Sequence, residues 1–244
     1  MKGMLATLRR ELRAYYFSPL AYVIATFLLL INGVLFAIIV SYLSDPRYPG
    51  GRPLDLFFSM SWLILLFGTP FLTMRLLSEE RKSGSIEVLM TAPVTEAHVV
   101  VGKYLAALAF FASLWLPTLA YAVIVAYYSE LDWGTLAAGY LGILGIGALA
   151  LSIGVFASAM SKNQIVAAVV TFALLFVFFF VFGWTENLVN STALKQAFGY
   201  LDVLAPLQDF AKGIVDTRTL VYYLSTTVFF LFLTARALEA KKWR

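Results

Sequence analysis

The sequence has no cysteine, a single histidine and few charges, which make up only 13% of its 244 residues. Without cysteine the chain has no disulfides, no thiol nucleophile and no thiolate metal ligands. The lone histidine, His98, has no nearby partners for a metal site or a Ser-His-Asp triad, so we interpret it as an ordinary interfacial residue. We therefore expect no catalytic residue and no metal site in this chain.

A phosphate-binding loop is also missing. The pattern G-x-x-x-x-G-K-[ST] does not occur, and Gly102-Lys103-Tyr104 lacks both the preceding glycine and the Ser or Thr. The chain is not expected to bind ATP by that route.

Most of the sequence is apolar. Hydrophobic residues make up 61% of it, and the mean hydropathy is +0.84, whereas ordinary soluble domains carry roughly 25% charged residues. Six uncharged stretches are long enough to cross a bilayer, which takes about 20 residues. We predict an all-α, polytopic membrane protein with six spans at 19–43, 56–75, 99–128, 134–160, 164–183 and 219–237.

None of these spans has a charged residue at its centre. Transporters driven by proton or sodium gradients usually keep such groups there. The pattern therefore disfavours a self-contained secondary transporter.

Basic residues indicate how the spans are oriented. The N-terminal segment, the loop after the second span through Lys103, the loop at Lys162 and the C-terminal tail hold 13 of the 18 Lys and Arg residues. Because cytoplasmic flanks retain positive charge, both termini are predicted to be cytoplasmic, in a bacterial inner or plasma membrane. Topology and anionic lipid headgroups account for the basic excess, so no nucleic-acid partner is expected.

Residues 1–18 precede the first span and combine leucines at helical spacing with Arg9, Arg10 and Arg13. This pattern favours an amphipathic helix lying at the membrane interface, with a bend at Pro19. The alternative is a basic segment that only orients the first span.

Small and kink-forming residues mark spans two to four. Pro70 and Pro117 each remove a backbone donor within a span, and they are either hinges or simply determinants of helix shape. Ala150, Gly154 and Ser158 have the small-xxx-small spacing of closely packed helices, within this chain or between two chains.

The loop at 76–97 is the most informative segment. Ser78 can cap a short helix with Glu79 and Glu80 in its first turn, and Gly84 ends it; a second short helix starts near Ser85 and includes Glu87. Two such helices suit a docking surface. The alternative is a solvated hairpin that only joins two spans.

Residues 78–94, SEERKSGSIEVLMTAPV, resemble the signature that follows the second span in ABC-2 type transporter permeases. Further motifs are similar to the gliding-motility-associated branch of that family: Ser18-Pro19, Gly102-Lys103, and the segments at 163–167 and 213–218.

The resemblance implies a six-span permease subunit that pairs with a second permease chain, identical or related, and docks on separate ABC ATP-binding subunits. ATP and magnesium would be bound by those subunits, and no cofactor by this chain. The loop would be the coupling helix, whose contact residues are Glu79, Glu80, Arg81, Lys82, Gly84, Ser85 and Glu87. Membrane lipids and an accessory membrane or periplasmic protein are further expected partners.

Residues 184–218 form a predicted external loop that is too long for a bare connection. Short amphipathic helices are expected there, with Pro206 as a break and Asp216 or Thr217 capping the last span, and they act either as a gate or as a cap on the bundle. For the whole chain, the rival hypothesis is a non-transporting membrane scaffold that recruits a cytoplasmic protein through the same loop.

Overall fold

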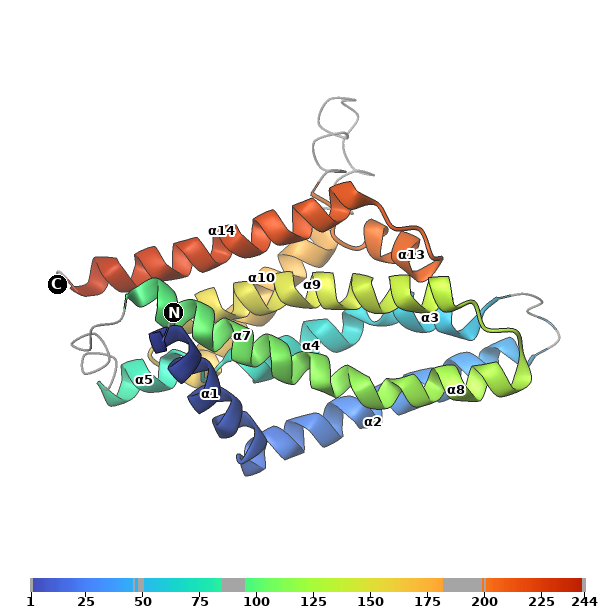
Figure 1. The fold of residues 1–244 in the computed structure, drawn as a ribbon, viewed down its shortest axis with the longest axis horizontal. Helices are drawn as coiled ribbons and strands as arrows, with labels where there is room; N and C mark the ends of the chain where they lie inside the picture. The colour runs from blue at the N-terminus through green and yellow to red at the C-terminus, as the bar shows by residue number, and fades with distance from the viewer. Residues whose placement is uncertain are drawn as a thin grey trace.

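A computed structural model of the chain describes residues 2–45, 47, 51–84, 95–181, 199 and 201–242. Within these ranges the fold is entirely helical, and six segments are long and apolar enough to cross a membrane. The predicted all-α fold with six spans is confirmed. Figure 1 shows these helices running side by side, with both termini at one end of the bundle. We call this the terminal end and the opposite one the distal end.

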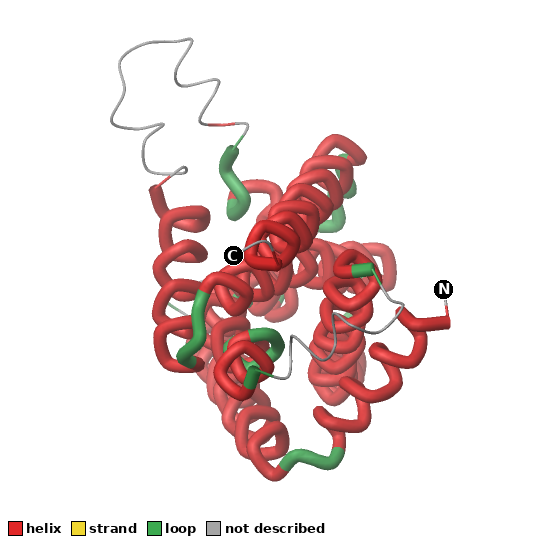
Figure 2. The backbone as a smooth tube through the Cα atoms, turned by 90° about the vertical axis from the view of Figure 1, so that its left-hand side faces the viewer, coloured by secondary structure: helices red, strands yellow, loops and turns green. Residues whose placement is uncertain are grey.

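The chain begins with helix α1 (Lys2–Tyr16), which bends sharply into α2 (Pro19–Leu43). Ser18 has an extended backbone, and Pro19 occupies the first turn of α2, where its missing N–H removes no helical hydrogen bond. α1 packs along α7 rather than standing apart from the bundle, and Figure 2 shows it at the side of the terminal end. Its buried residues include Thr7 and Tyr15, whereas Leu5 remains 44% exposed.

The predicted second span, 56–75, falls on two helices instead of one. These are α3 (Pro53–Met60) and α4 (Trp62–Thr73), separated at Ser61. The buried Ser61 hydroxyl donates to the Phe57 carbonyl at 2.7 Å, a local bond of the kind that bends helices. α4 continues through Pro70 without a break, so a hinge at that residue stays a prediction.

The third span changes helix type at its proline. α7 (Glu96–Trp115) passes through the 3-10 turn η1 (Leu116–Thr118), which contains Pro117, into α8 (Leu119–Tyr128). The Thr118 hydroxyl donates to the Trp115 carbonyl at 2.6 Å within this turn. Pro117 therefore shapes the span, and movement about it stays a prediction.

The centre of the fold is α9 (Trp133–Met160), which packs against α3, α4, α7, α10, α13 and α14. Its small residues allow this close packing. A side chain at Gly142 would come within 2.7 Å of Phe210 on α13, and one at Gly154 would overlap Thr73 on α4. At these glycines the close helix packing is within the chain.

The remaining helices complete the bundle. α10 (Gln164–Phe176) ends in the π-helical turn η2 (Val177–Val181), and α13 (Ala205–Ala211) precedes the long α14 (Thr217–Lys242). Pro206 lies in the first turn of α13, so it begins a helix instead of breaking one. Asp216 caps α14 by accepting from the Arg218 amide at 2.8 Å. The rest of the short helices predicted between 184 and 198 lie outside the described residues.

Candidate functional site

Helix α5 (Ser78–Ser83) lies at the terminal end of the bundle, directly after α4. It is the first of the two short helices predicted for this loop. Gly84 ends it with φ of 73°, a left-handed conformation that glycine adopts without strain. Ser85, Glu87 and the predicted second helix lie outside the described residues.

The start of α5 is held by α9 rather than by its own side chain. Ser78 was expected to cap the helix, but its hydroxyl donates back to the Met74 carbonyl. The Leu77 and Ser78 amides instead donate to the Ser158 hydroxyl oxygen, each at 3.1 Å, and Ser158 donates to the Met74 carbonyl at 3.1 Å. Ser158 thereby uses all of its hydrogen-bonding capacity on this one turn.

Arg81 fixes α5 to the same helix. Its guanidinium donates to the backbone carbonyl of Ala159 in the last turn of α9. A cation at a helix C-terminus interacts favourably with the carbonyl groups that have no intrahelical partner. The resemblance implied that Arg81 contacts a partner subunit, whereas in this structure the residue reaches into its own chain.

Glu80 also points inward, into a group of four residues that we call the charge cluster: Arg10, Glu11, Glu80 and Lys103. One oxygen of Glu80 lies 2.7 Å from Arg10 and 3.0 Å from Lys103. Glu11 pairs with the same two cations at 2.7 and 2.9 Å. The charge cluster therefore ties three helices together: α1, α5 and α7.

Lys103 is the buried member of the charge cluster. It counted as a loop residue in the predicted charge distribution, but it lies in α7 and is only 1% exposed. Because burying an unpaired charge is strongly unfavourable, its two carboxylate partners are required by its position. The neighbouring Gly102 lets α1 lie this close, since a side chain there would come within 3.0 Å of the Met4 carbonyl.

The Glu11 carboxyl titrates under opposing influences. Burial would raise its pKa, but Lys103 and then Arg10 outweigh that effect and hold the pKa below its ordinary value. Glu11 is consequently ionised at neutral pH, as the pairing with two cations requires.

A second contact joins the bend between α1 and α2 to the end of α4. Arg75 donates to the Ser18 hydroxyl at 2.9 Å and lies over the ring of Tyr15, 5.2 Å from its centroid. The Tyr15 hydroxyl donates to the Leu72 carbonyl at 2.6 Å. The N-terminal bend is thus fixed to the segment that leads into α5.

Other predicted site residues face outward. Glu79 and Lys82 are exposed on α5, and no ion pair joins them to another described residue. Arg9 and Arg13 are exposed on α1, whereas Arg10 belongs to the charge cluster. The predicted contact set of α5 is therefore divided between two inward residues, Glu80 and Arg81, and two outward ones.

The charge cluster borders a cleft of about 630 Å³ between α1 and α5, which Tyr15, Arg75 and Glu79 also line. Within the described ranges, no three His, Asp or Glu residues gather as metal ligands. The charge cluster offers ion pairs and helix contacts, which hold α1, α5 and α7 in position.

Sequence reasoning missed four of the residues that hold α5: Glu11, Arg75, Lys103 and Ser158. For Lys103 the sequence held one indication. It is a single basic residue near the start of a span, and a long uncharged stretch follows it. Glu11 is the only acid among the basic residues of α1. For Ser158 the small-residue spacing predicted close packing but not a hydroxyl that accepts from two amides.

Comparison with known proteins supports the resemblance at the level of the family. None of the curated proteins matches the chain significantly. The model of the ABC-2 family transporter proteins matches residues 22–243, which include the loop with α5 and all six spans except the first three residues of span one. The chain therefore belongs to the ABC-2 family of transporter proteins, as a multi-pass membrane permease component.

Proposed function

We propose that α5 is the element through which a separate ATP-binding subunit moves this permease. The observation that carries the proposal is the double attachment of α5, to α9 through Ser158 and Ala159 and to α1 and α7 through the charge cluster. A helix that only joined two spans would not need both attachments. A helix that transmits displacement needs both attachments, because a loosely held helix would move without moving the spans.

The attachments define a route for movement. α9 is the central helix and contacts most other spans, so a displacement of α5 acts on the bundle core directly. Lys103 carries the same displacement to α7, and α4 is joined to α5 by the chain itself. Packed helices shift as rigid bodies rather than deforming continuously.

The outward residues of α5 are the proposed docking surface. Glu79 and Lys82 carry opposite charges and lie on the exposed side of the helix. Charges at the rim of an interface contribute to partner choice and register more than to affinity. Ser85 and Glu87 continue this surface in the proposal, and ATP and magnesium belong to the partner subunit.

The rest of the predicted assembly is part of the same proposal. Arg9 and Arg13 on the exposed side of α1 face anionic headgroups, with both termini in the cytoplasm and the bundle in the inner membrane. A second permease chain and an accessory membrane or periplasmic protein complete the complex. We assign the chain to the gliding-motility-associated branch on the motifs quoted above.

The test is recovery of the partner from the native host. We expect the chain to co-purify with an ATP-binding subunit, and the charge reversals Glu79→Lys and Lys82→Glu to reduce its recovery several-fold. Asp209→Lys is the matched control, because Asp209 is exposed on α13 at the distal end. Recovery of the chain without any ATP-hydrolysing subunit would favour the scaffold instead.

A further inference from the structure

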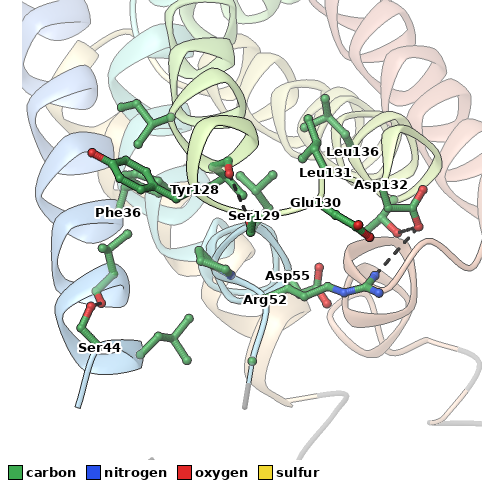
Figure 3. A pocket seen from close by; sticks show the side chains of 18 residues that line it. Phe36, Ser44, Arg52, Asp55, Tyr128, Ser129, Glu130, Leu131, Asp132 and Leu136 are labelled. Atoms are coloured by element: carbon green, nitrogen blue, oxygen red, sulfur yellow. Dashed lines mark hydrogen bonds and ion pairs between the residues drawn. The ribbon is translucent and has the colours of Figure 1, made fainter. Parts of the chain in front are cut away.

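A cavity of about 620 Å³ opens at the distal end of the bundle, between α2, α3, α8 and α9 (Figure 3). This volume is within the range of small-molecule sites, about 300 to 1,000 Å³. The cavity lies at the opposite end of the molecule from the charge cluster, and none of its lining residues belongs to the site described above.

The cavity has an apolar part and a charged part. Apolar side chains from α2, α8 and α9 line its body, among them Phe36, Val40, Ile124, Val125 and Leu136. Several of these are also open to the bundle surface: Ile124 is 47% and Val40 37% exposed. An alkyl chain can therefore enter between α2 and α8 from the surrounding lipid.

Charged side chains gather at the mouth of the cavity. Arg52, Asp55, Glu130 and Asp132 come from the start of α3 and the turn between α8 and α9. Asp132 caps the N-terminus of α9, since it accepts from the Gly134 amide at 2.9 Å and from the Thr135 hydroxyl at 2.8 Å. Arg52 reaches it at 3.9 Å and remains 67% exposed, which leaves most of the guanidinium accessible to an anion.

One carboxylate oxygen of Asp55 has no donor among the described residues. Its Oδ1 atom is buried and accepts no hydrogen bond from any residue that the structure describes. Desolvation raises the pKa of this carboxyl above its ordinary value, and Asp132 adds to that effect, whereas Arg52 and Lys212 offset only part of it. A buried acceptor without a donor is unfavourable, so an occupant that brings an N–H group would be stabilised here.

We infer that this cavity binds a phospholipid whose headgroup carries a primary ammonium, as an ethanolamine phospholipid does. The ammonium donates to Asp55, with Glu130 on the same rim, and the phosphate faces Arg52. One acyl chain lies along the apolar wall formed by α2 and α8. In the proposed orientation of the bundle the lipid belongs to the outer leaflet, but the binding chemistry is independent of α5 and its partner.

Charge complementarity selects this occupant among the common lipids. A quaternary choline headgroup has no N–H and cannot donate to Asp55. A glycerol headgroup leaves the lipid with a net negative charge opposite three carboxylates. Only a headgroup with both a donor cation and a phosphate matches the acids and Arg52 together.

Native mass spectrometry of the purified protein tests this directly. The protein is titrated in detergent with ethanolamine, choline and glycerol phospholipids that have identical acyl chains. We expect the ethanolamine lipid to bind about tenfold more tightly than the choline lipid, the difference made by one hydrogen bond to a charged group. Equal affinity for these two lipids would overturn the inference.

Two variants locate the site. Asp55→Asn should abolish the preference for ethanolamine over choline, and Ile124→Trp should fill the cavity and weaken binding of all three lipids. Matched controls are Asp209→Asn, an exposed acid outside the cavity, and Val123→Trp, which is 70% exposed on the same helix and does not line it. If Asp55→Asn kept the preference, or if Ile124→Trp behaved like Val123→Trp, the site would be refuted.

A further arm distinguishes a lipid from a free headgroup. Glycerophosphoethanolamine carries the same ammonium and phosphate without acyl chains. It is expected to bind at least about tenfold more weakly than the lipid, because it buries no acyl chain against the apolar wall. Comparable binding of both would show that the apolar wall takes no acyl chain.

Discussion

The Nζ atom of Lys103 lies 3.0 Å from Oε1 of Glu80, which joins a buried base of α7 to the short helix α5. The two residues are far apart in the sequence, and Glu11 of α1 completes the contact at 2.9 Å. A loop helix is thus bound to α7 by the buried Lys103 and to α1 by the half-exposed Arg10. This contact makes the attachment of α5 open to direct experiment.

Removing the buried base should be strongly destabilising. Lys103→Met leaves the Glu11 and Glu80 carboxylates together with only the half-exposed Arg10, and breaking such a buried pair typically loses about 3–5 kcal/mol. Chemical unfolding of the detergent-purified protein measures the change. Lys82→Met, at an exposed position on α5, is the control and should change the free energy of unfolding by less than about 0.5 kcal/mol.

Removing the two acids as well should restore part of that loss. Glu11→Gln and Glu80→Gln combined with Lys103→Met replace the buried charges by neutral groups, which proteins often tolerate well. If Lys103→Met alone were no more harmful than Lys82→Met, the charge cluster would not hold α5.

The charge cluster also predicts a dependence on pH. The folded-state pKa of Glu11 lies below its ordinary value, so its contribution to stability is complete above about pH 4.3, the unfolded value, and is lost as the pH falls through the folded pKa. Thermal unfolding followed from pH 7 to pH 3 should show this loss. In Glu11→Gln the decline should be shallower, and an identical decline in both proteins would contradict the pairing.

Ser158 should govern the local stability of α5. Ser158→Ala leaves the Leu77 and Ser78 amides without their acceptor, at a cost of about 1–3 kcal/mol for each buried group. Hydrogen exchange should accelerate at these two amides. Ser152→Ala is the matched control on α9, because that hydroxyl donates only to the Leu149 carbonyl of its own helix; equal exchange in the two variants would contradict the role of Ser158.

Close packing between α4 and α9 gives a steric prediction. Gly154→Ala places a methyl group against Thr73 and should destabilise the fold by about 1–3 kcal/mol, and Thr73→Ala should relieve that overlap. Gly33→Ala in α2 is the control, since its nearest neighbour, the Tyr121 hydroxyl, lies at 3.6 Å. The free energy of unfolding distinguishes them, and equal effects would indicate that Gly154 is not closely packed.

Much of the fold could be predicted from the sequence because long uncharged stretches become spans wherever they occur. α2 begins and ends at the predicted residues, and the bend at Pro19 follows from the fixed φ of proline. The interruption of the second span could not be predicted. It occurs at Ser61, not at Pro70, and depends on a hydroxyl turned to its own helix in a buried position.

The site was harder to predict for a different reason. The sequence indicated a short helix at Ser78 and its end at Gly84, since both depend on local preferences. Which side of that helix faces inward depends on Lys103 and on the Ala159 carbonyl, which are distant in the sequence. The predicted contact set therefore placed Glu80 and Arg81 together with Glu79 and Lys82. In the structure the first two point inward and the last two are exposed.

If α5 drives the permease, movement of α5 must reach the distal end of the bundle. Since the chain has no cysteine, spin labels can be attached at introduced cysteines alone. One label is placed at Tyr127→Cys on α8 and the other at Asp209→Cys on α13. In the complex with the ATP-binding subunit, pulsed EPR then measures the distance between these two helices at the distal end. We predict an ATP-dependent change in this distance that is lost in Ser158→Ala while the subunit remains bound. The same change with and without Ser158 would contradict it.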